Sequence, residues 1–288
     1  MLTIPLSEAM NVQPVKRETA DHLELTLRMY VDEVRLHLDK RACLKCDICS
    51  LVCPREAVTI IAGEEDLDIT IDPRVCVMCE VCAHFCPVGA VTLSYNGVPK
   101  AVFAEQRGLA PFLPKILMEK DKCVLPCPPL PEEEPHWCRQ QLKLVAGAAE
   151  GCPKQCRKCL EACPREAIIL DATAQTIPEP DLCLRCSQCL TVCEYEAIRV
   201  NPQFRGVVAI DAVKCPPECV KCINLCPVKA IVREGSRVYV KLETCSYCGV
   251  CRNICDYEAI AFTREEVVAE PGEFSLAWEH AVAKLLEG

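Results

Sequence analysis

The sequence is poor in aromatic residues, since Phe, Tyr and Trp together make up 5% of its 288 residues. Large pockets lined by aromatic rings, common around organic ligands, are therefore not expected. No run approaches 18 apolar residues, so the sequence predicts no membrane-spanning helix. Histidine is also scarce, with five residues and none in an evident catalytic triad or H-x-x-E arrangement. The chain therefore offers no recognisable catalytic base or nucleophile.

The chain also lacks an excess of basic residues. Lys and Arg number 32 against 41 Asp and Glu, a formal net charge of −9. A protein that binds nucleic acid normally presents a basic surface, so this balance argues against that class of partner. Residues 1–12 show neither the basic start nor the apolar stretch of a secretory signal. We therefore expect a cytoplasmic protein whose cysteines stay reduced.

Cysteine, in contrast, is abundant, with 27 residues. The odd number excludes complete pairing in disulfides. Three cysteines, Cys123, Cys127 and Cys138, stand apart, and the other 24 form six groups of four. The groups are Cys43, Cys46, Cys49 and Cys53; Cys76, Cys79, Cys82 and Cys86; Cys152, Cys156, Cys159 and Cys163; Cys183, Cys186, Cys189 and Cys193; Cys215, Cys219, Cys222 and Cys226; and Cys245, Cys248, Cys251 and Cys255.

The spacing within the groups distinguishes iron–sulfur clusters from zinc. Four groups read C-x2-C-x2-C-x3-C, and the third and fifth open with C-x3-C instead. Zinc motifs usually pair two short hooks across a longer loop. Three closely spaced thiolates followed by a fourth are typical of [4Fe–4S] clusters, whose four irons each need one soft ligand. The sequence therefore predicts six such clusters.

The repeats extend beyond the cysteines. After each fourth cysteine an alanine recurs at a fixed offset, followed by a β-branched residue, as in Cys53-Pro-Arg-Glu-Ala-Val. This pattern predicts a short strand after each motif, for example over 57–62 and 90–95, and a small β-loop-α-β element used six times. The long stretch between Cys86 and Cys152 separates the first two motifs from the others, so the motifs pair as 1–2, 3–4 and 5–6.

These motifs resemble those of the bacterial-type two-[4Fe–4S] ferredoxins, repeated three times as in a polyferredoxin. The resemblance covers residues 34–100 and 151–262 and implies an α+β fold with a pseudo-twofold axis and one-electron transfer. In two-cluster ferredoxins the fourth cysteine of each run binds the other run's cluster. We number the sites by the motif that supplies three ligands. The implied ligands are Cys43, Cys46, Cys49 and Cys86 (site one); Cys76, Cys79, Cys82 and Cys53 (site two); Cys152, Cys156, Cys159 and Cys193 (site three); Cys183, Cys186, Cys189 and Cys163 (site four); Cys215, Cys219, Cys222 and Cys255 (site five); and Cys245, Cys248, Cys251 and Cys226 (site six).

The expected organisation is therefore three tandem ferredoxin units with additions. Residues 1–100 hold a β-hairpin extension and the first unit, 151–205 the second unit, and 206–265 the third. The hairpin is predicted from alternating apolar residues over 23–38, with a turn near Asp32 and Glu33. It either supports the first unit or offers an edge to a partner strand. Residues 266–288 predict an amphipathic helix that packs on this chain or on a partner.

Residues 101–150 form a proline-containing insertion. Cys123, Cys127 and Cys138, with His136 beside the last, have the donor set of a Cys3His zinc site. A seventh iron–sulfur cluster is the other metal site that these cysteines would suit. The alternative is that they are reduced thiols in an interface loop.

The leading functional hypothesis is a non-catalytic electron-transfer subunit with six [4Fe–4S] clusters, working with other subunits of a low-potential redox complex. Among polyferredoxins, the hairpin and insertion are most similar to the subunits found in archaeal formylmethanofuran dehydrogenases. Polyferredoxins of methanogen hydrogenases or heterodisulfide-reductase complexes are alternatives within the class. A cluster-bearing scaffold, or an enzyme with its own metal site in residues 101–150, is the alternative from another class.

Overall fold

The computed structural model describes residues 13–62, 67–118, 158–170, 176–178, 182–193 and 198–287. Cys123, Cys127 and Cys138, whose role was left open above, and Cys152 and Cys156 of site three lie outside these residues. The chain divides into two compact units, residues 1–110 with 273–285, and residues 111–272 with 286–288. Every described helix is too short or too polar to cross a lipid bilayer.

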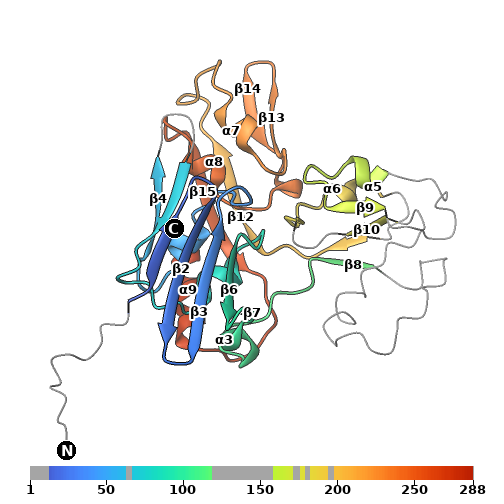
Figure 1. The fold of residues 1–288 in the computed structure, drawn as a ribbon. Coiled ribbons are helices and arrows are strands. Elements are labelled where there is room, and N and C mark those ends of the chain that lie inside the picture. Colours follow the sequence, from blue (N-terminus) through green and yellow to red (C-terminus); the bar gives the residue numbers. More distant parts are fainter. Residues whose placement is uncertain are drawn as a thin grey trace, which may run out of the picture. The chain divides into compact units, whose positions relative to one another are not determined.

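The first unit is built on a five-stranded sheet in the order β1-β2-β3-β6-β7, with neighbours antiparallel (Figure 1). Its strands are β1 (Val15–Glu18), β2 (His22–Met29), β3 (Asp32–Asp39), β6 (Val91–Tyr95) and β7 (Val98–Pro99). A separate hairpin joins β4 (Val58–Ala62) to β5 (Leu67–Ile71). The helices are α1 (Ile48–Leu51), α2 (Val81–Phe85), α3 (Val102–Glu105) and α9 (Leu276–Glu287), the last belonging to this unit as far as Leu285.

The expected N-terminal hairpin is confirmed as β2 and β3, which place Leu23 opposite Leu38 and Leu25 opposite Leu36. Alternate residues of the two strands are buried because side chains alternate between the faces of a sheet, and β3 continues the sheet by pairing with β6. The hairpin therefore supports the first cysteine-rich repeat. The turn lies at Tyr30 and Val31, before the expected Asp32 and Glu33. Both turn residues are hydrophobic yet 99% and 89% exposed. The pattern of hydrophobic residues therefore did not reveal the position of the turn.

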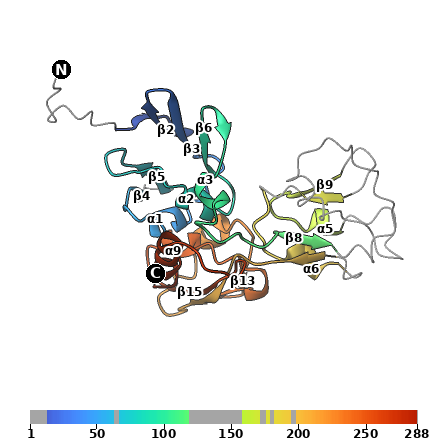
Figure 2. The same cartoon turned by 90° about the horizontal axis from the view of Figure 1, so that it is seen from below.

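In the residues that the structure describes, the second unit contains four two-stranded antiparallel sheets. The pairs are β8 (Ile116–Met118) with β11 (Ile198–Val200), β9 (Ile168–Leu170) with β10 (Thr176–Pro178), β12 (Phe204–Ile210) with β15 (Ile260–Val267), and β13 (Ile231–Glu234) with β14 (Arg237–Val240). Its helices are α5 (Lys158–Glu161), α6 (Gln188–Thr191), α7 (Lys221–Leu225) and α8 (Val250–Asn253), with a 3-10 turn η3 (Leu242–Thr244). Figures 1 and 2 both show α5, α6, β8 and β9 grouped together.

One order of elements occurs three times along the chain. A first strand precedes one cysteine motif, a hairpin or strand pair separates it from the next, and a last strand pairs with the first. The outer pairs are β3 with β6, β8 with β11, and β12 with β15. In the last pair the strands approach closely at a bulge, where a Cβ on Gly206 would lie 2.0 Å from the Thr263 carbonyl oxygen.

The C-terminal helix α9 packs on this chain rather than being left for a partner. The Trp278 ring stacks on Phe85 of α2 with centroids 5.1 Å apart and meets His84 edge-on at 6.1 Å. Ser275, which precedes the helix, donates a hydrogen bond from Oγ to the Gly108 carbonyl. The helix therefore closes the first unit although almost 200 residues of sequence separate it from α2.

Replacing Leu285 by alanine should lower the free energy of unfolding by about 2–5 kcal/mol, because a fully buried side chain is truncated. Leu285 is 0% exposed, whereas Leu276 on the same helix is 81% exposed. Leu276→Ala is therefore the matched control and should change stability by less than about 0.5 kcal/mol. Anaerobic thermal denaturation of the two variants checks this, and equal melting temperatures would contradict the packing described for α9.

Candidate metal centres

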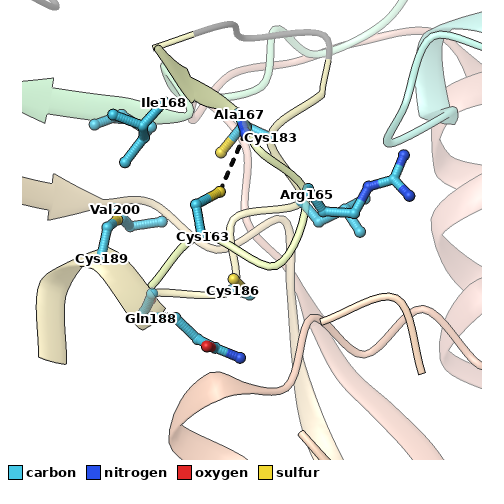
Figure 3. Close-up of a pocket in the computed structure, with 12 residues that line it drawn as sticks. Cys163, Arg165, Ala167, Ile168, Cys183, Cys186, Gln188, Cys189 and Val200 are labelled. Atoms are coloured by element: carbon cyan, nitrogen blue, oxygen red, sulfur yellow. Dashed lines mark hydrogen bonds between the residues drawn. The ribbon is translucent and has the colours of Figure 1, made fainter. Parts of the chain in front are cut away.

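Four cysteines from two different motifs surround one cavity in the second unit (Figure 3). Cys163 closes the third motif, and Cys183, Cys186 and Cys189 open the fourth. The empty space between them, part of it open to solvent, is about 350 Å³. Apolar side chains of the flanking strands, including Ile116 of β8 and Val200 of β11, complete the wall. These four cysteines are the set assigned above to site four.

Two further cavities have the same construction. Each is lined by the fourth cysteine of one motif and the first three of the next. About 320 Å³ lies between Cys53, Cys76, Cys79 and Cys82, the site two set. About 330 Å³ lies between Cys226, Cys245, Cys248 and Cys251, the site six set.

The cysteines of sites one, three and five are also brought together where the structure describes them. Burial, followed by the charges of neighbouring thiolates that include Cys86, raises the pKa of Cys49 in site one. In site five, burial and the charges of Cys215, Cys219 and Cys255 raise the pKa of Cys222 to about 11. Of the site three set, Cys159 and Cys193 pack against the same core cluster.

The sulfurs of each set are spread around a space and do not converge on a point. Among the described residues, no three His, Cys, Asp or Glu side chains are close enough to hold a single metal ion. A cubane needs a different arrangement, with one thiolate at each of four iron corners. The cavities with four cysteines around them therefore fit a [4Fe–4S] cluster.

The loops that carry the first two cysteines have a recurring backbone conformation. In four motifs the second residue after the first cysteine and the residue after the second cysteine both have positive φ. These pairs are Lys45 and Asp47, Met78 and Glu80, Arg185 and Ser187, and Tyr247 and Gly249. The left-handed conformation costs a non-glycine residue roughly 1–2 kcal/mol. Its recurrence at matched positions indicates that the loop shape serves the site.

This conformation aims backbone N–H groups at the sulfurs. The residue two positions on donates to the first cysteine in four motifs, as Lys45 does to the Cys43 Sγ at 3.3 Å. Val81, Gln188 and Val250 donate in the same way to the second cysteines. Successive N–H groups that face one space favour an anion there. The loops are thus prepared for thiolates and the negative charge of a cluster.

The fixed offset of the alanine now has a structural reason. After the five fourth cysteines whose turn the structure describes, the third residue also has positive φ, and the following alanine donates its N–H to that cysteine's sulfur. The donors are Ala57 at 3.3 Å, Ala90 at 3.2 Å, Ala167 at 3.2 Å, Ala230 at 3.3 Å and Ala259 at 3.4 Å. The positive-φ residues are Glu56, Gly89, Glu166, Lys229 and Glu258. A five-residue turn therefore both orients the sulfur and starts the next strand.

The longer C-x3-C opening of the fifth motif uses different support. No residue from Cys215 to Cys222 has positive φ. Arg233 of β13 instead donates hydrogen bonds to the carbonyls of Pro217 and Cys219, the second at 2.7 Å. The guanidinium thus holds a loop that the extra residue has displaced from the usual conformation. The corresponding opening of the third motif lies outside the described residues.

Burial raises the pKa of twelve thiols in these sets. The pKa of Cys186 rises to about 11 and those of Cys189 and Cys245 to about 12, with burial as the largest cause. These thiols therefore hold their protons more tightly than an exposed cysteine does. Binding iron as thiolates must release these protons, which couples cluster binding to pH.

Buried charged side chains lie beside some of the loops. Glu80 is 3% exposed and accepts hydrogen bonds from the Tyr95 hydroxyl and the backbone N–H groups of Val102 and Phe103. Arg264 is 1% exposed and donates to the carbonyls of Tyr247 and Cys248 in site six. Neither residue was predictable from the sequence, because no motif distinguishes a charged side chain that packs against a loop backbone from one at the surface.

Comparison with known proteins matches residues 37–93 to the family described as a 4Fe-4S dicluster domain. A ferredoxin of Methanothermococcus thermolithotrophicus is 42% identical over 55 residues, which is 18% of this chain and 92% of the relative. An uncharacterized ferredoxin of Methanocaldococcus jannaschii is 40% identical over 55 residues, 18% of this chain and 89% of the relative.

Among solved structures, a chain of the formate dehydrogenase–heterodisulfide reductase–formylmethanofuran dehydrogenase complex of Methanospirillum hungatei has a similar fold. The TM-score is 0.76 with 24% sequence identity, and the match covers 95% of this chain and 91% of that chain. The similarity to the two ferredoxins extends over 55 residues, whereas the similarity to this solved chain extends over nearly the whole chain.

Proposed function

We propose, from the premise that the chain belongs to the ferredoxin family of [4Fe–4S] dicluster proteins, that it is a six-cluster electron relay. The chain is an iron–sulfur electron-transfer protein, and three tandem two-cluster units would supply its six centres. Each bound cluster takes up and releases one electron at a time. The protein binds and orients the clusters, and no part of it is proposed to act as a catalyst.

The observation that carries the proposal is the repeated cavity lined by cysteines of two motifs. Sites two, four and six each bring one fourth cysteine to three others. Backbone N–H groups donate to the sulfurs, and this lowers the cost of holding several thiolates together. Hydrogen bonds to sulfur, burial and nearby charge are also what set the potential of a cluster. The same groups would therefore bind the clusters and tune them.

We further propose that the chain is a subunit of a larger redox complex in archaeal C1 metabolism. The similar chain belongs to a complex that contains formylmethanofuran dehydrogenase and heterodisulfide reductase. The full-length match supports the same kind of setting, with formylmethanofuran dehydrogenase as the main assignment. A relay between heterodisulfide reductase and another enzyme is the second assignment. Either setting gives the chain protein partners for both the entry and the exit of electrons.

Anaerobically purified protein should contain about 24 iron and 24 acid-labile sulfide per chain, from six cubanes of four each. Iron by colorimetric assay and sulfide by acid release measure this directly. A seventh cubane would add about four of each and would implicate Cys123, Cys127 and Cys138. Recovery of zinc without sulfide would contradict the cluster assignment.

Native complexes isolated without oxygen test the proposed partners. The chain should migrate in one large species with catalytic redox subunits, and those subunits should lose electron supply when it is removed. Turnover of a substrate by the isolated chain, beyond electron exchange with dyes, would contradict the relay role.

A further inference from the structure

Arg185 is a buried cation inside a candidate cluster loop. Its side chain is enclosed, with 8% of the residue exposed, and it sits two residues after Cys183 and next to Cys186 in site four. One guanidinium nitrogen, Nη1, donates to the carbonyls of Leu113 at 2.7 Å and Asn201 at 3.0 Å. The residue is therefore held in place by the segments before β8 and after β11.

The charge of Arg185 has little compensation in the described part of the chain. Its Nε is buried without a hydrogen-bond partner, and the two carbonyls that it contacts are neutral. The electrostatic attraction of its guanidinium is to Cys183 of site four. A buried cation is costly unless an anion accompanies it. The anion that would accompany Arg185 is the cluster held by the four cysteines of site four.

The other motifs carry different residues at the position of Arg185. The four matched positions share the left-handed conformation, with φ of 57° at Lys45, 54° at Met78, 56° at Arg185 and 52° at Tyr247. Met78 in site two is also buried, at 6% exposure. The fold thus accepts a buried neutral side chain here, so the loop shape does not itself require arginine.

We propose that Arg185 is a potential-setting residue, whose buried guanidinium raises the reduction potential of the cluster held by Cys163, Cys183, Cys186 and Cys189. The inference rests on the proposed function. Reduction adds one electron, and hence one negative charge, to the cluster. A fixed cation nearby stabilises the reduced form more than the oxidised form, and low exposure keeps solvent from screening it. Site four would therefore hold an electron more firmly than it would with a neutral residue.

Two substitutions separate charge from packing. Arg185→Met places at site four the residue that site two tolerates at the same backbone conformation. Arg185→Lys keeps the positive charge but lacks the planar guanidinium whose Nη1 bonds the Leu113 and Asn201 carbonyls. Arg205→Gln removes one positive charge from an exposed position, 59% exposed and paired with Glu266, and serves as the control for net charge.

The experiment is an anaerobic redox titration of full-length protein followed by electron paramagnetic resonance, with iron and sulfide measured on every sample. In Arg185→Met the reduction potential of one cluster should fall by at least about 59 mV, which is a tenfold change in the equilibrium constant of a one-electron reduction. Arg185→Lys should stay close to the wild type, and Arg205→Gln should shift no component by that amount.

An unchanged titration of Arg185→Met with its full iron and sulfide would overturn the proposal. If Arg185→Met loses the cluster, Arg185→Lys decides, because a lysine variant that keeps both cluster and potential supports a charge effect. Two results would overturn the proposal and assign Arg185 to the assembly of the site. One is the loss of about four iron from both variants, and the other is a tenfold fall in the reduction equilibrium of the lysine variant. Wild-type protein without iron and sulfide would instead refute the proposed function.

Discussion

Removal of iron and sulfide is expected to unfold most of the molecule. The helices beside the cysteines, such as α1, α6 and α8, have four residues each, far below the length at which a helix is stable alone. The paired strands of the second unit form two-stranded sheets, which are marginal in isolation. The clusters would thus be the main connection between motifs, and structural metal can supply on the order of 10 kcal/mol.

Circular dichroism of protein stripped with acid and chelator under argon, then returned to neutral pH with reductant, measures this effect. The secondary-structure signal and the cooperative thermal transition should both be lost. Reconstitution with ferrous iron and sulfide should restore them and is the control for chemical damage. Stripped protein that keeps its native spectrum and melting transition would show that the fold is independent of the clusters.

Cys53→Ser is expected to remove the cluster of site two and to leave the cluster of site one in place. Cys53 lines one cavity with Cys76, Cys79 and Cys82, although Cys43, Cys46 and Cys49 precede it directly in sequence. Iron content should fall by up to four per chain. Cys86→Ser is the reciprocal variant and should affect site one in the same way.

Double variants make the assignment independent of spectroscopy. If Cys53 and Cys76 bind one cluster, the variant that changes both should lose no more than about four iron. Cys53→Ser combined with Cys43→Ser should then lose about eight, because two clusters are affected. The opposite pattern would mean that each motif closes its own cluster, and the exchange of fourth cysteines would be wrong for this pair.

The features that repeat in residue type were predictable from the sequence. Cysteine spacing is visible because each iron needs a thiolate, and the recurring alanine with its β-branched neighbour predicted the strands that became β4 and β6. Alternation over 23–38 predicted the hairpin because its inner face is buried. The C-terminal helix was predicted as well, but the choice between this chain and a partner needed the contacts of Trp278 with Phe85 and His84.

Features that depend on backbone or tertiary placement were not predictable. The left-handed positions hold residues as different as Lys45, Met78 and Tyr247 because the N–H, not the side chain, contacts the cysteine. Strand β8 has three residues within a segment interpreted as an insertion, and its pairing with β11 spans about 80 positions. Arg185 and Arg264 look like ordinary surface arginines in sequence, since only the fold buries them.

The construction of each cavity from two motifs has a consequence for synthesis on the ribosome. A chain that has emerged only as far as Cys53 cannot complete any four-cysteine set described for the first unit, because each set includes residues from the second motif. Cluster insertion would have to wait until a whole pair of motifs has left the exit tunnel. Until then the emerging thiols are exposed to oxidation, and a cell that makes this protein must protect them or load the pairs one after another.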